Sequence, residues 1–278
     1  MPEGDTLFRI ATGLRGALVG GRVLEARARP GPLLRHVPDL SGLVGLRVRG
    51  VESRGKHLLI TFGEGDQTRT LRTHLRMTGS WHRYRPGERW RLPERRATVV
   101  LRTDHAVAVC FDCPTAELLT DAGLARSKAL TGLGPDLLGP AFDANAALAN
   151  LRERGNVAVG EALLDQRLLA GIGNVVRNEV LFMERVNPLS RVESLSETEL
   201  QRIVAAAQRV LRSAARDGNR TTTGDRRRGA RLWVYSRAGR PCRRCGTRIE
   251  VSRQGELPRL IYWCPSCQRD VLTGAEPR

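Results

Sequence analysis

The spacing of apolar residues predicts a helix at the start of the chain and a group of strands after it. Between Thr6 and Leu18 the apolar side chains recur at a helical interval. From Arg22 onward the interval becomes two, and Gly, Pro and Asp turns separate the apolar runs. The expected strands cover residues 23–27, 46–53, 57–62, 70–75, 97–102 and 106–111. This pattern predicts an antiparallel sandwich or barrel of about 120 residues.

The second half of the chain has a helical pattern. Residues 125–141 are rich in Gly and Pro and are expected to form a linker. Beyond them, the expected helices run from an Asp143 cap towards Gly155, over 159–169, over 174–184, and from a capping box at Ser196-Glu197-Thr198-Glu199 to about Arg216. The Gly171-Ile172-Gly173-Asn174 turn either presents backbone amides to a phosphate or simply connects two helices.

Four cysteines near the end of the chain have the spacing of a structural zinc site. They form two C-x2-C pairs, and they are Cys242, Cys245, Cys264 and Cys267. Four thiolates leave no open position for a catalytic water. Zinc is therefore expected to fold a short two-stranded ribbon and to hold Arg259 at its tip. A second pair, Cys110 and Cys113, has no partner pair, so we interpret it as two thiols at the end of a strand.

These patterns together predict an α+β, multi-domain chain. The expected parts are a sandwich domain with a leading helix at 1–124, a linker at 125–141, a helical domain at 142–231 and a zinc ribbon at 232–271. The helical domain would consist of helices joined by two tight turns. No run of residues approaches the length of a membrane span, and no secretory signal is apparent, so a cytoplasmic or nucleoid location is expected.

Charge changes this picture most. The 278 residues carry a net charge of +17, and all but two of the 46 basic residues are Arg. Such an excess indicates a polyanionic partner, of which nucleic acid is the commonest, although an arginine-rich proteome is the alternative. Aromatic residues make up only 4% of the chain, which disfavours a base-stacking platform for single strands and favours a duplex. The basic residues are densest over 209–248, where the stretch 221–231 is expected to order on DNA.

The first residues offer candidate chemistry. Removal of Met1 would leave Pro2 with a free secondary amine, which can attack an electrophilic carbon. Glu3 follows directly and can exchange protons at the same place. The alternative is that Pro2 is an ordinary second residue.

Motifs spread over nearly the whole chain resemble the formamidopyrimidine-DNA glycosylase/endonuclease VIII family, and its endonuclease VIII-like branch in particular. The resemblance rests on Pro2-Glu3-Gly4, Arg54-Gly55-Lys56, His74-Leu75-Arg76-Met77-Thr78-Gly79, Leu164-Asp165-Gln166 with Gly171-Ile172-Gly173-Asn174, and the four-cysteine ribbon. It implies a bifunctional enzyme of base excision repair that removes an oxidised base and then cleaves the strand. Its partner would be double-stranded DNA with an oxidised base or an abasic site, bound by a monomer.

The resemblance also implies roles for single residues. Pro2 would attack the sugar C1′ and form a Schiff base, and Glu3 would donate a proton at the sugar. Lys56 would assist the first elimination and bind phosphate, and Arg259 would hold phosphate and serve the second elimination. Among the DNA-binding residues, Met77 would fill the space of the flipped base, Arg76 would reach the orphaned base and Asn174 the backbone.

Two departures leave alternatives open. Asp5 and Thr6 stand where many members have Pro-Glu, so an acid used by relatives is missing or displaced to Asp5. The stretch 221–231 is short, which favours oxidised pyrimidines over the purines 8-oxoguanine and formamidopyrimidine. A damaged-DNA-binding protein without catalytic activity on the same scaffold is the alternative from another functional class.

Overall fold

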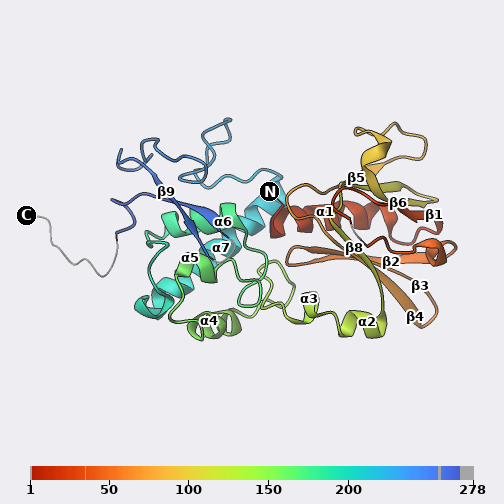
Figure 1. The fold of residues 1–278 in the computed structure, drawn as a ribbon, viewed down its shortest axis with the longest axis horizontal. Coiled ribbons are helices and arrows are strands. Elements are labelled where there is room, and N and C mark those ends of the chain that lie inside the picture. Colours follow the sequence, from red (N-terminus) through yellow and green to blue (C-terminus); the bar gives the residue numbers. More distant parts are fainter. Residues whose placement is uncertain (1, 35, 256–257, 270–278) are drawn as a thin grey trace, which may run out of the picture. The chain divides into compact units, whose positions relative to one another are not determined.

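The chain forms two compact units, Met1–Gly132 and Leu133–Arg278 (Figure 1). The computed structural model describes residues 2–34, 36–255 and 258–269. The boundary between the units falls inside the segment expected to be a linker, which also contains the short helix α3 (Lys128–Thr131). Among the described residues, no helix has both the length and the apolar character needed to cross a membrane.

The first unit is an antiparallel sandwich of two four-stranded sheets. One sheet has the strand order β1-β6-β7-β5 and the other β2-β3-β4-β8. The elements are α1 (Gly4–Leu18), β1 (Val23–Ala28), β2 (Arg47–Arg54), β3 (His57–Glu64), β4 (Gln67–His74), β5 (Ser80–Tyr84), β6 (Ala97–Thr103), β7 (Val107–Phe111), β8 (Thr115–Thr120) and α2 (Asp121–Ala125). The leading helix, six strands and their antiparallel pairing were expected. β5 and β8 were not expected.

One apolar core joins both sheets and α1. The buried face of α1 consists of Leu7, Ala11, Leu14 and Leu18, at the helical spacing seen in the sequence. These side chains pack in the same cluster as residues of both sheets, such as Val99 and Ile60. This packing fixes the helix, and with it the residues at its N-terminal end, against the sheets.

A second, smaller cluster covers the outer face of β5, β6 and β7. It contains Tyr84, Val107 and Phe111, and Trp90 from the loop before β6 packs against it. All five residues of β7 are consequently buried. A strand that is buried on both faces has a continuous run of apolar residues, and residues 106–111 are such a run.

The second unit begins with helices packed around their own core. They are α4 (Ala144–Arg152), α5 (Val159–Ala162), α6 (Asn174–Met183) and α7 (Glu197–Asp217). The Asp143 carboxylate caps α4 by accepting a hydrogen bond from the Ala146 N–H at 3.0 Å, and the capping box opens α7 as predicted. The helix predicted over 159–169 is wrong beyond Ala162, because the chain there enters the turns before α6.

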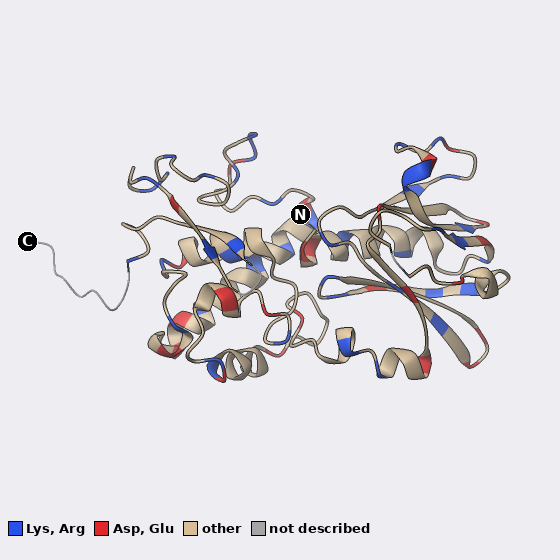
Figure 2. Cartoon of the chain, viewed as in Figure 1, with Lys and Arg blue, Asp and Glu red and all other residues tan. Residues whose placement is uncertain are grey.

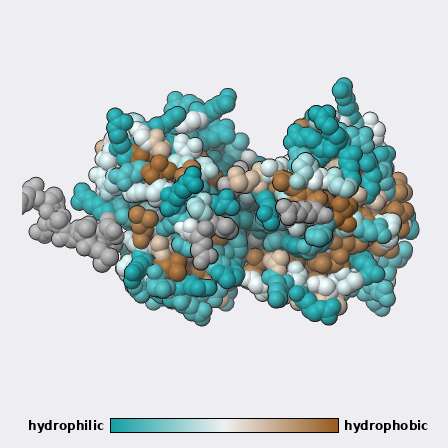
Figure 3. Space-filling view, viewed as in Figure 1, coloured by the Kyte–Doolittle hydropathy of each residue, from teal (hydrophilic) through white to brown (hydrophobic). Residues whose placement is uncertain are grey.

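The ribbon follows as the hairpin β9 (Glu250–Gln254) and β10 (Arg259–Trp263), which pair antiparallel. Arg259 lies opposite Gln254 in the last pair before the turn, at the tip as expected. Figure 2 shows that Lys and Arg residues occur on helices, strands and loops of each unit. Figure 3 shows hydrophilic side chains over much of the drawn face, with apolar patches between them.

Candidate active site and nucleic-acid interface

Pro2 and Glu3 stand at the N-terminal end of α1. Glu3 is the N-cap residue and is fully buried, and its carbonyl oxygen accepts hydrogen bonds from Thr6 N at 2.9 Å and Leu7 N at 3.1 Å. The buried Asp5 directs Oδ1 to the Thr6 N–H at 2.8 Å. The start of the chain is therefore held in place, since Glu3 is buried and α1 packs into the core.

Lys56 lies in a two-residue turn between β2 and β3. Arg54 and His57 form the closing pair of the hairpin, and Gly55 takes a φ of 54°. A positive φ at this position suits a tight hairpin turn and favours glycine. Lys56 is thus carried on a short, well-defined turn at the edge of the sandwich.

The segment between β4 and β5 presents Arg76 and Met77. Arg76 has a φ of 46°, in the left-handed region, and the Gly79 N–H donates to the Leu75 carbonyl at 2.9 Å, which closes the loop. Met77 is 61% exposed, the highest value among the large apolar residues described as exposed. An exposed Met on a closed loop has the form that a wedge between bases requires.

A chain of polar contacts runs under these two loops. The buried Arg72 donates to Glu117 at 2.7 Å and to His57 Nδ1 at 2.9 Å. The His57 and His74 rings lie 4.8 Å apart, and His74 Nδ1 accepts the Arg76 N–H at 3.3 Å. We name Glu117, Arg72, His57 and His74 the polar chain. Because an arginine and a backbone N–H can only donate, Nδ1 must be the acceptor on both imidazoles, and each neutral ring carries its proton on Nε2.

Both histidines are neutral at neutral pH. Burial, followed by the charge of the other ring and of nearby Arg72 and Lys56, lowers the pKa of His57 from 6.5 to about 3. Burial and the charges of Lys56, Arg76 and Arg72 lower the pKa of His74 from 6.5 to about 4. Lys56 and Arg76 are therefore near enough to His74 to act on it. The two histidines therefore add no positive charge to this cationic region at neutral pH.

Acidification is expected to destabilise the first unit before its carboxylates titrate. The folded histidines have a lower pKa than in the unfolded chain, so the unfolded state binds more protons and stability falls as pH drops below 6.5. Between pH 6.5 and 5 the slope should reach about 1.4 kcal/mol per pH unit for each histidine. Urea unfolding of the first unit at several pH values measures it. His57→Gln should reduce the slope of unfolding free energy against pH. The control His105→Gln, on an exposed turn, should leave the slope unchanged. Equal slopes for the two variants would contradict the lowered pKa of His57.

The second unit organises its glycine turn through Gln166. The Gln166 amide donates to the carbonyls of Leu164 at 2.9 Å and Ile172 at 3.1 Å, and its Oε1 accepts the Gly171 N–H at 3.1 Å. One side chain therefore fixes the backbone that leads into α6, where Gly173 is the N-cap residue. The side chain of Gln166 thus fixes the turns between α5 and α6. Whether their backbone amides bind a phosphate or the turns only connect two helices stays a prediction.

The first turns of α6 hold the ribbon by side chain to backbone bonds. Asn174 donates from Nδ2 to the Leu260 carbonyl at 3.0 Å, Arg177 donates to the same oxygen at 3.2 Å, and Asn178 Oδ1 accepts the Tyr262 N–H at 2.6 Å. Arg177 and Asn178 were not expected from the sequence, because they sit in an apolar helical run. A buried polar residue inside such a run is the signal that marks them.

Gly160 makes this docking possible. A Cβ at Gly160 would lie 2.6 Å from Gln254 Oε1, 2.8 Å from Ile261 Cδ1 and 2.9 Å from the Pro188 carbonyl. A side chain at Gly160 would press on the ends of two ribbon side chains and on the Pro188 backbone, so glycine leaves the space that the ribbon side chains occupy beside α5.

The four ribbon cysteines converge. All four Sγ atoms lie within 4.8 Å of one another, the only such group of metal-ligating side chains among the described residues. Cys264 is fully buried and Cys245 is exposed. The cluster can bind a metal ion, and four convergent thiols fit tetrahedral coordination.

Glu179, on α6, anchors the segment before the ribbon. It is fully buried, and its carboxylate accepts N–H bonds from Trp233 at 2.7 Å, Val234 at 2.9 Å and Tyr235 at 2.8 Å and a hydroxyl bond from Thr222. The stretch 221–231 is also closed by the Thr222 N–H bond to the Arg231 carbonyl at 2.9 Å. This stretch therefore has polar contacts of its own, which leave no apolar period in the sequence, and its ordering on DNA stays a prediction.

The predicted site residues divide between the units. Pro2, Glu3, Lys56, Arg76 and Met77 belong to the first unit, and Asn174, Arg259 and the four cysteines to the second. Within the first unit, Lys56 and Arg76 both lie near His74, because the charge of each lowers the pKa of His74. Within the second, contacts to β10 bring Asn174 next to the strand that starts at Arg259.

Comparison with known proteins identifies the class of this fold and site. Residues 1–116 match the formamidopyrimidine-DNA glycosylase N-terminal domain, and residues 133–225 match the formamidopyrimidine-DNA glycosylase H2TH domain. The chain belongs to the formamidopyrimidine-DNA glycosylase family.

The sequences of similar proteins indicate the branch of the family. The chain is 42% identical to the probable endonuclease 8 2 of Streptomyces coelicolor, over 100% of both chains. It is 43% identical to the DNA-(apurinic or apyrimidinic site) lyase Nei2 of Mycolicibacterium smegmatis, over 96% of this chain and 99% of the relative. Its fold matches Lactococcus lactis Fpg in complex with an abasic site containing DNA, with a TM-score of 0.80 and 23% identity over 97% of this chain and 100% of that one. The expected endonuclease VIII-like branch is confirmed.

Proposed function

We propose that Pro2 is the nucleophile with which this DNA glycosylase and abasic-site lyase acts in base excision repair. The observation that carries the proposal is the fixed position of Pro2 next to the buried Glu3 at the start of α1. Once Met1 is removed, the nitrogen of Pro2 is a secondary amine with a free electron pair. The end of a helix anchored in the core then holds it in a constant position.

The amine accounts for both reactions. Its nitrogen bonds to C1′ of the damaged nucleotide as the bond from C1′ to the base breaks, and the base leaves with a proton. Opening of the sugar then gives an iminium ion, and its positive charge acidifies the C2′ proton. Loss of that proton expels the 3′ phosphate, which is β-elimination. Glu3 is the group placed to give and take the proton at the sugar.

Phosphate contacts are proposed for two cations, one in each unit. Lys56, on its tight turn, binds phosphate and assists the first elimination, while Arg259 holds phosphate for the second. The docking of β10 on α6 supports a defined position for Arg259, since Asn174, Arg177 and Asn178 all bind this strand. We propose Zn2+ as the ion of the four-cysteine cluster, where it supplies structural cross-linking and no chemistry.

The proposed DNA contacts follow from exposure and shape. Met77 enters the duplex where the damaged nucleotide leaves it, Arg76 contacts the orphaned base, and Asn174 lies at the backbone. Asn174 also binds the ribbon, so its substitution would loosen Arg259 as well. The net charge of +17 supports double-stranded DNA, with an oxidised base or an abasic site, as the partner of a monomer in the bacterial nucleoid.

Oxidised pyrimidines are the proposed substrates. The stretch 221–231 is short and is pinned to the buried Glu179 through Thr222, which leaves little length to fold over a large purine. Duplexes that each carry one lesion test this point. Faster release of an oxidised pyrimidine than of 8-oxoguanine or formamidopyrimidine is expected, and the reverse order would assign the chain to purine lesions.

The polar chain is proposed to position Lys56 and Arg76. Arg72→Leu removes the donor to His57 and leaves Glu117 without its partner, at an expected cost of about 1–3 kcal/mol in unfolding free energy. Strand cleavage should slow by about tenfold in kcat with little change in KM, because the loops lose alignment but keep their charges. Arg69→Leu, on the same strand but exposed, is the matched control. An unchanged kcat for Arg72→Leu would contradict the positioning role.

Borohydride trapping on abasic-site DNA separates the enzyme from a damaged-DNA-binding protein without activity. Reduction of the imine gives a stable covalent complex, so an adduct is expected for the processed chain. Binding to the same DNA with no adduct would leave only the binding protein. The chain has only two lysines, Lys56 and Lys128, which limits the amines that can compete with Pro2.

A further inference from the structure

The stretch 221–231 is held from the ribbon as well as from α6. The two residues between the first pair of ribbon cysteines are both arginines, Arg243 and Arg244. Arg243 donates from Nε to the Leu232 carbonyl at 3.1 Å and from Nη2 to the Gly229 carbonyl at 2.6 Å. One guanidinium group therefore holds two carbonyl oxygens, one inside the stretch and one directly after it.

Arg244 adds an aromatic contact on the same side. Its guanidinium carbon lies over the Phe182 ring, 4.6 Å from the ring centre, and 5.6 Å from the centre of the Trp233 ring. The two rings stack with their centres 5.4 Å apart. Trp233 in turn donates from its indole Nε1 to the Thr222 carbonyl at 2.9 Å. The flat cation thus extends a stack of rings that is bonded to the stretch 221–231.

A third arginine braces the turn between the stretch and the ribbon. Arg237 is buried, and it donates from Nη2 to the Pro241 carbonyl at 2.8 Å and from Nη1 to the Trp233 carbonyl. Pro241 directly precedes the first ribbon cysteine. We name Arg237, Arg243 and Arg244 the arginine clamp. The clamp joins the first cysteine pair to the end of the stretch.

The stretch 221–231 is closed by contacts between its own two sides. Thr223 donates from Oγ1 to the Ala230 carbonyl at 2.8 Å, and Arg231 donates from Nε to the Arg226 carbonyl at 2.9 Å. Because these contacts link the beginning of the stretch to its end, a hold on the end positions the whole stretch.

We propose that the arginine clamp determines which damaged base is released, because it fixes the stretch 221–231 against the ribbon. The inference rests on the proposed function, in which this stretch limits the space for a purine. The three arginines are positioning residues that act through the stretch. Their effect is confined to substrates that carry a damaged base, since an abasic site offers no base to select.

Arginine-to-lysine variants of the full zinc-loaded chain test the clamp without changing the charge that binds DNA. Lysine has neither the fork that reaches two carbonyls nor the flat face that stacks on a ring. In Arg243→Lys/Arg244→Lys, the single-turnover ratio of oxidised-pyrimidine release to 8-oxoguanine release should fall about fivefold, which corresponds to the loss of contacts of this kind. Cleavage of abasic-site DNA should keep its wild-type rate.

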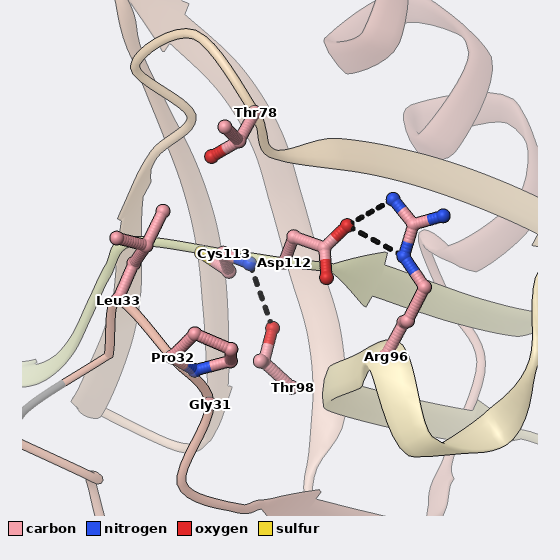
Figure 4. Close-up of a pocket in the computed structure, with 8 residues that line it drawn as sticks. All are labelled: Gly31, Pro32, Leu33, Thr78, Arg96, Thr98, Asp112 and Cys113. Atoms are coloured by element: carbon pink, nitrogen blue, oxygen red, sulfur yellow. Dashed lines mark hydrogen bonds and ion pairs between the residues drawn. The ribbon is translucent and has the colours of Figure 1, made fainter.

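Hydrogen exchange of the same variant reports on the position of the stretch directly. Backbone amides of residues 221–233 should exchange faster, while the metal content should equal that of the wild type, because all four cysteines are kept. Arg240→Lys, at an exposed position of the ribbon outside the clamp, is one control. Arg96→Lys is the other, since Arg96 also binds through Nε and Nη2, to Asp112 in the first unit (Figure 4). Both controls should keep the wild-type ratio.

An unchanged ratio in the clamp variant, with or without faster exchange, would overturn the proposal. An equal loss of abasic-site cleavage would also overturn it, because the clamp would then support activity in general. If the double variant does not fold, the two single variants replace it, each with a ratio lowered about twofold. A wild-type chain that fails to cleave abasic-site DNA would instead contradict the proposed function. If the wild type prefers 8-oxoguanine, only the proposed substrates are wrong, and the ratio should move towards one from the other side.

Discussion

A form of the chain that keeps Met1 in front of Pro2 is expected to give no borohydride adduct with abasic-site DNA and to cleave it at least about 10³-fold more slowly. The added peptide bond turns the nitrogen of Pro2 into an amide, whose electron pair is delocalised into the carbonyl. Since it can no longer form an imine, both base release and elimination lose their shared intermediate. Gel separation of trapped complexes and single-turnover cleavage measure the two effects.

Matched variants distinguish loss of the nucleophile from loss of binding. The blocked chain should still bind abasic-site DNA, because its basic residues are unchanged. Pro2→Gly should impair trapping without abolishing it, since a primary amine remains at the chain start. Lys128→Arg keeps the charge, removes one of the two competing lysines and should trap normally. Normal trapping by the blocked chain would place the nucleophile elsewhere.

Cys264→Ser is expected to have the second largest effect. Cys264 is fully buried in the four-thiol cluster, and loss of one thiolate should release most of the bound zinc. The hairpin that carries Arg259 would then lose its cross-link, so cleavage should fall by on the order of 10²-fold. The product should also shift from δ- to β-elimination, because the second step depends on Arg259.

Three measurements on the Cys264→Ser variant check this account: metal content, the ratio of β to δ products and the unfolding of the first unit. The first unit should unfold as in the wild type, since its core contains none of the ribbon residues. Cys113→Ser is the matched control for replacing a buried cysteine outside the cluster. A variant that has lost its zinc and still gives the wild-type product ratio would show that the ribbon does not hold Arg259 for the second step.

Features governed by nearby residues could be predicted from the sequence. The apolar period of α1 placed the helix, the Ser196 to Glu199 capping box placed the start of α7, and cysteine spacing indicated the ribbon cluster. Each depends on residues within a few turns or on a fixed ligand spacing. The first residues suggested a nucleophilic amine at Pro2 but left an ordinary second residue open, and the attack on the sugar came from the family resemblance.

Contacts between distant residues could not be predicted. The polar chain joins Glu117 to Arg72 and His57 across three strands, and no spacing in the sequence indicates their adjacency. The end of α5 at Ala162 was likewise missed, because the turn after it depends on bonds from Gln166 to residues on both sides. β5 and β8 were also missed, because each is stabilised by pairing with a strand that is distant or unmarked in the sequence, β5 with β7 and β8 with β4.

Mass spectrometric mapping of the borohydride-trapped complex tests the central claim most directly. After nuclease and protease digestion, the reduced sugar remnant should be found on the nitrogen of Pro2, in a peptide that lacks Met1. A remnant on the side-chain nitrogen of Lys56 or Lys128, or a trapped chain that still begins with Met1, would contradict the assignment of Pro2 as the nucleophile.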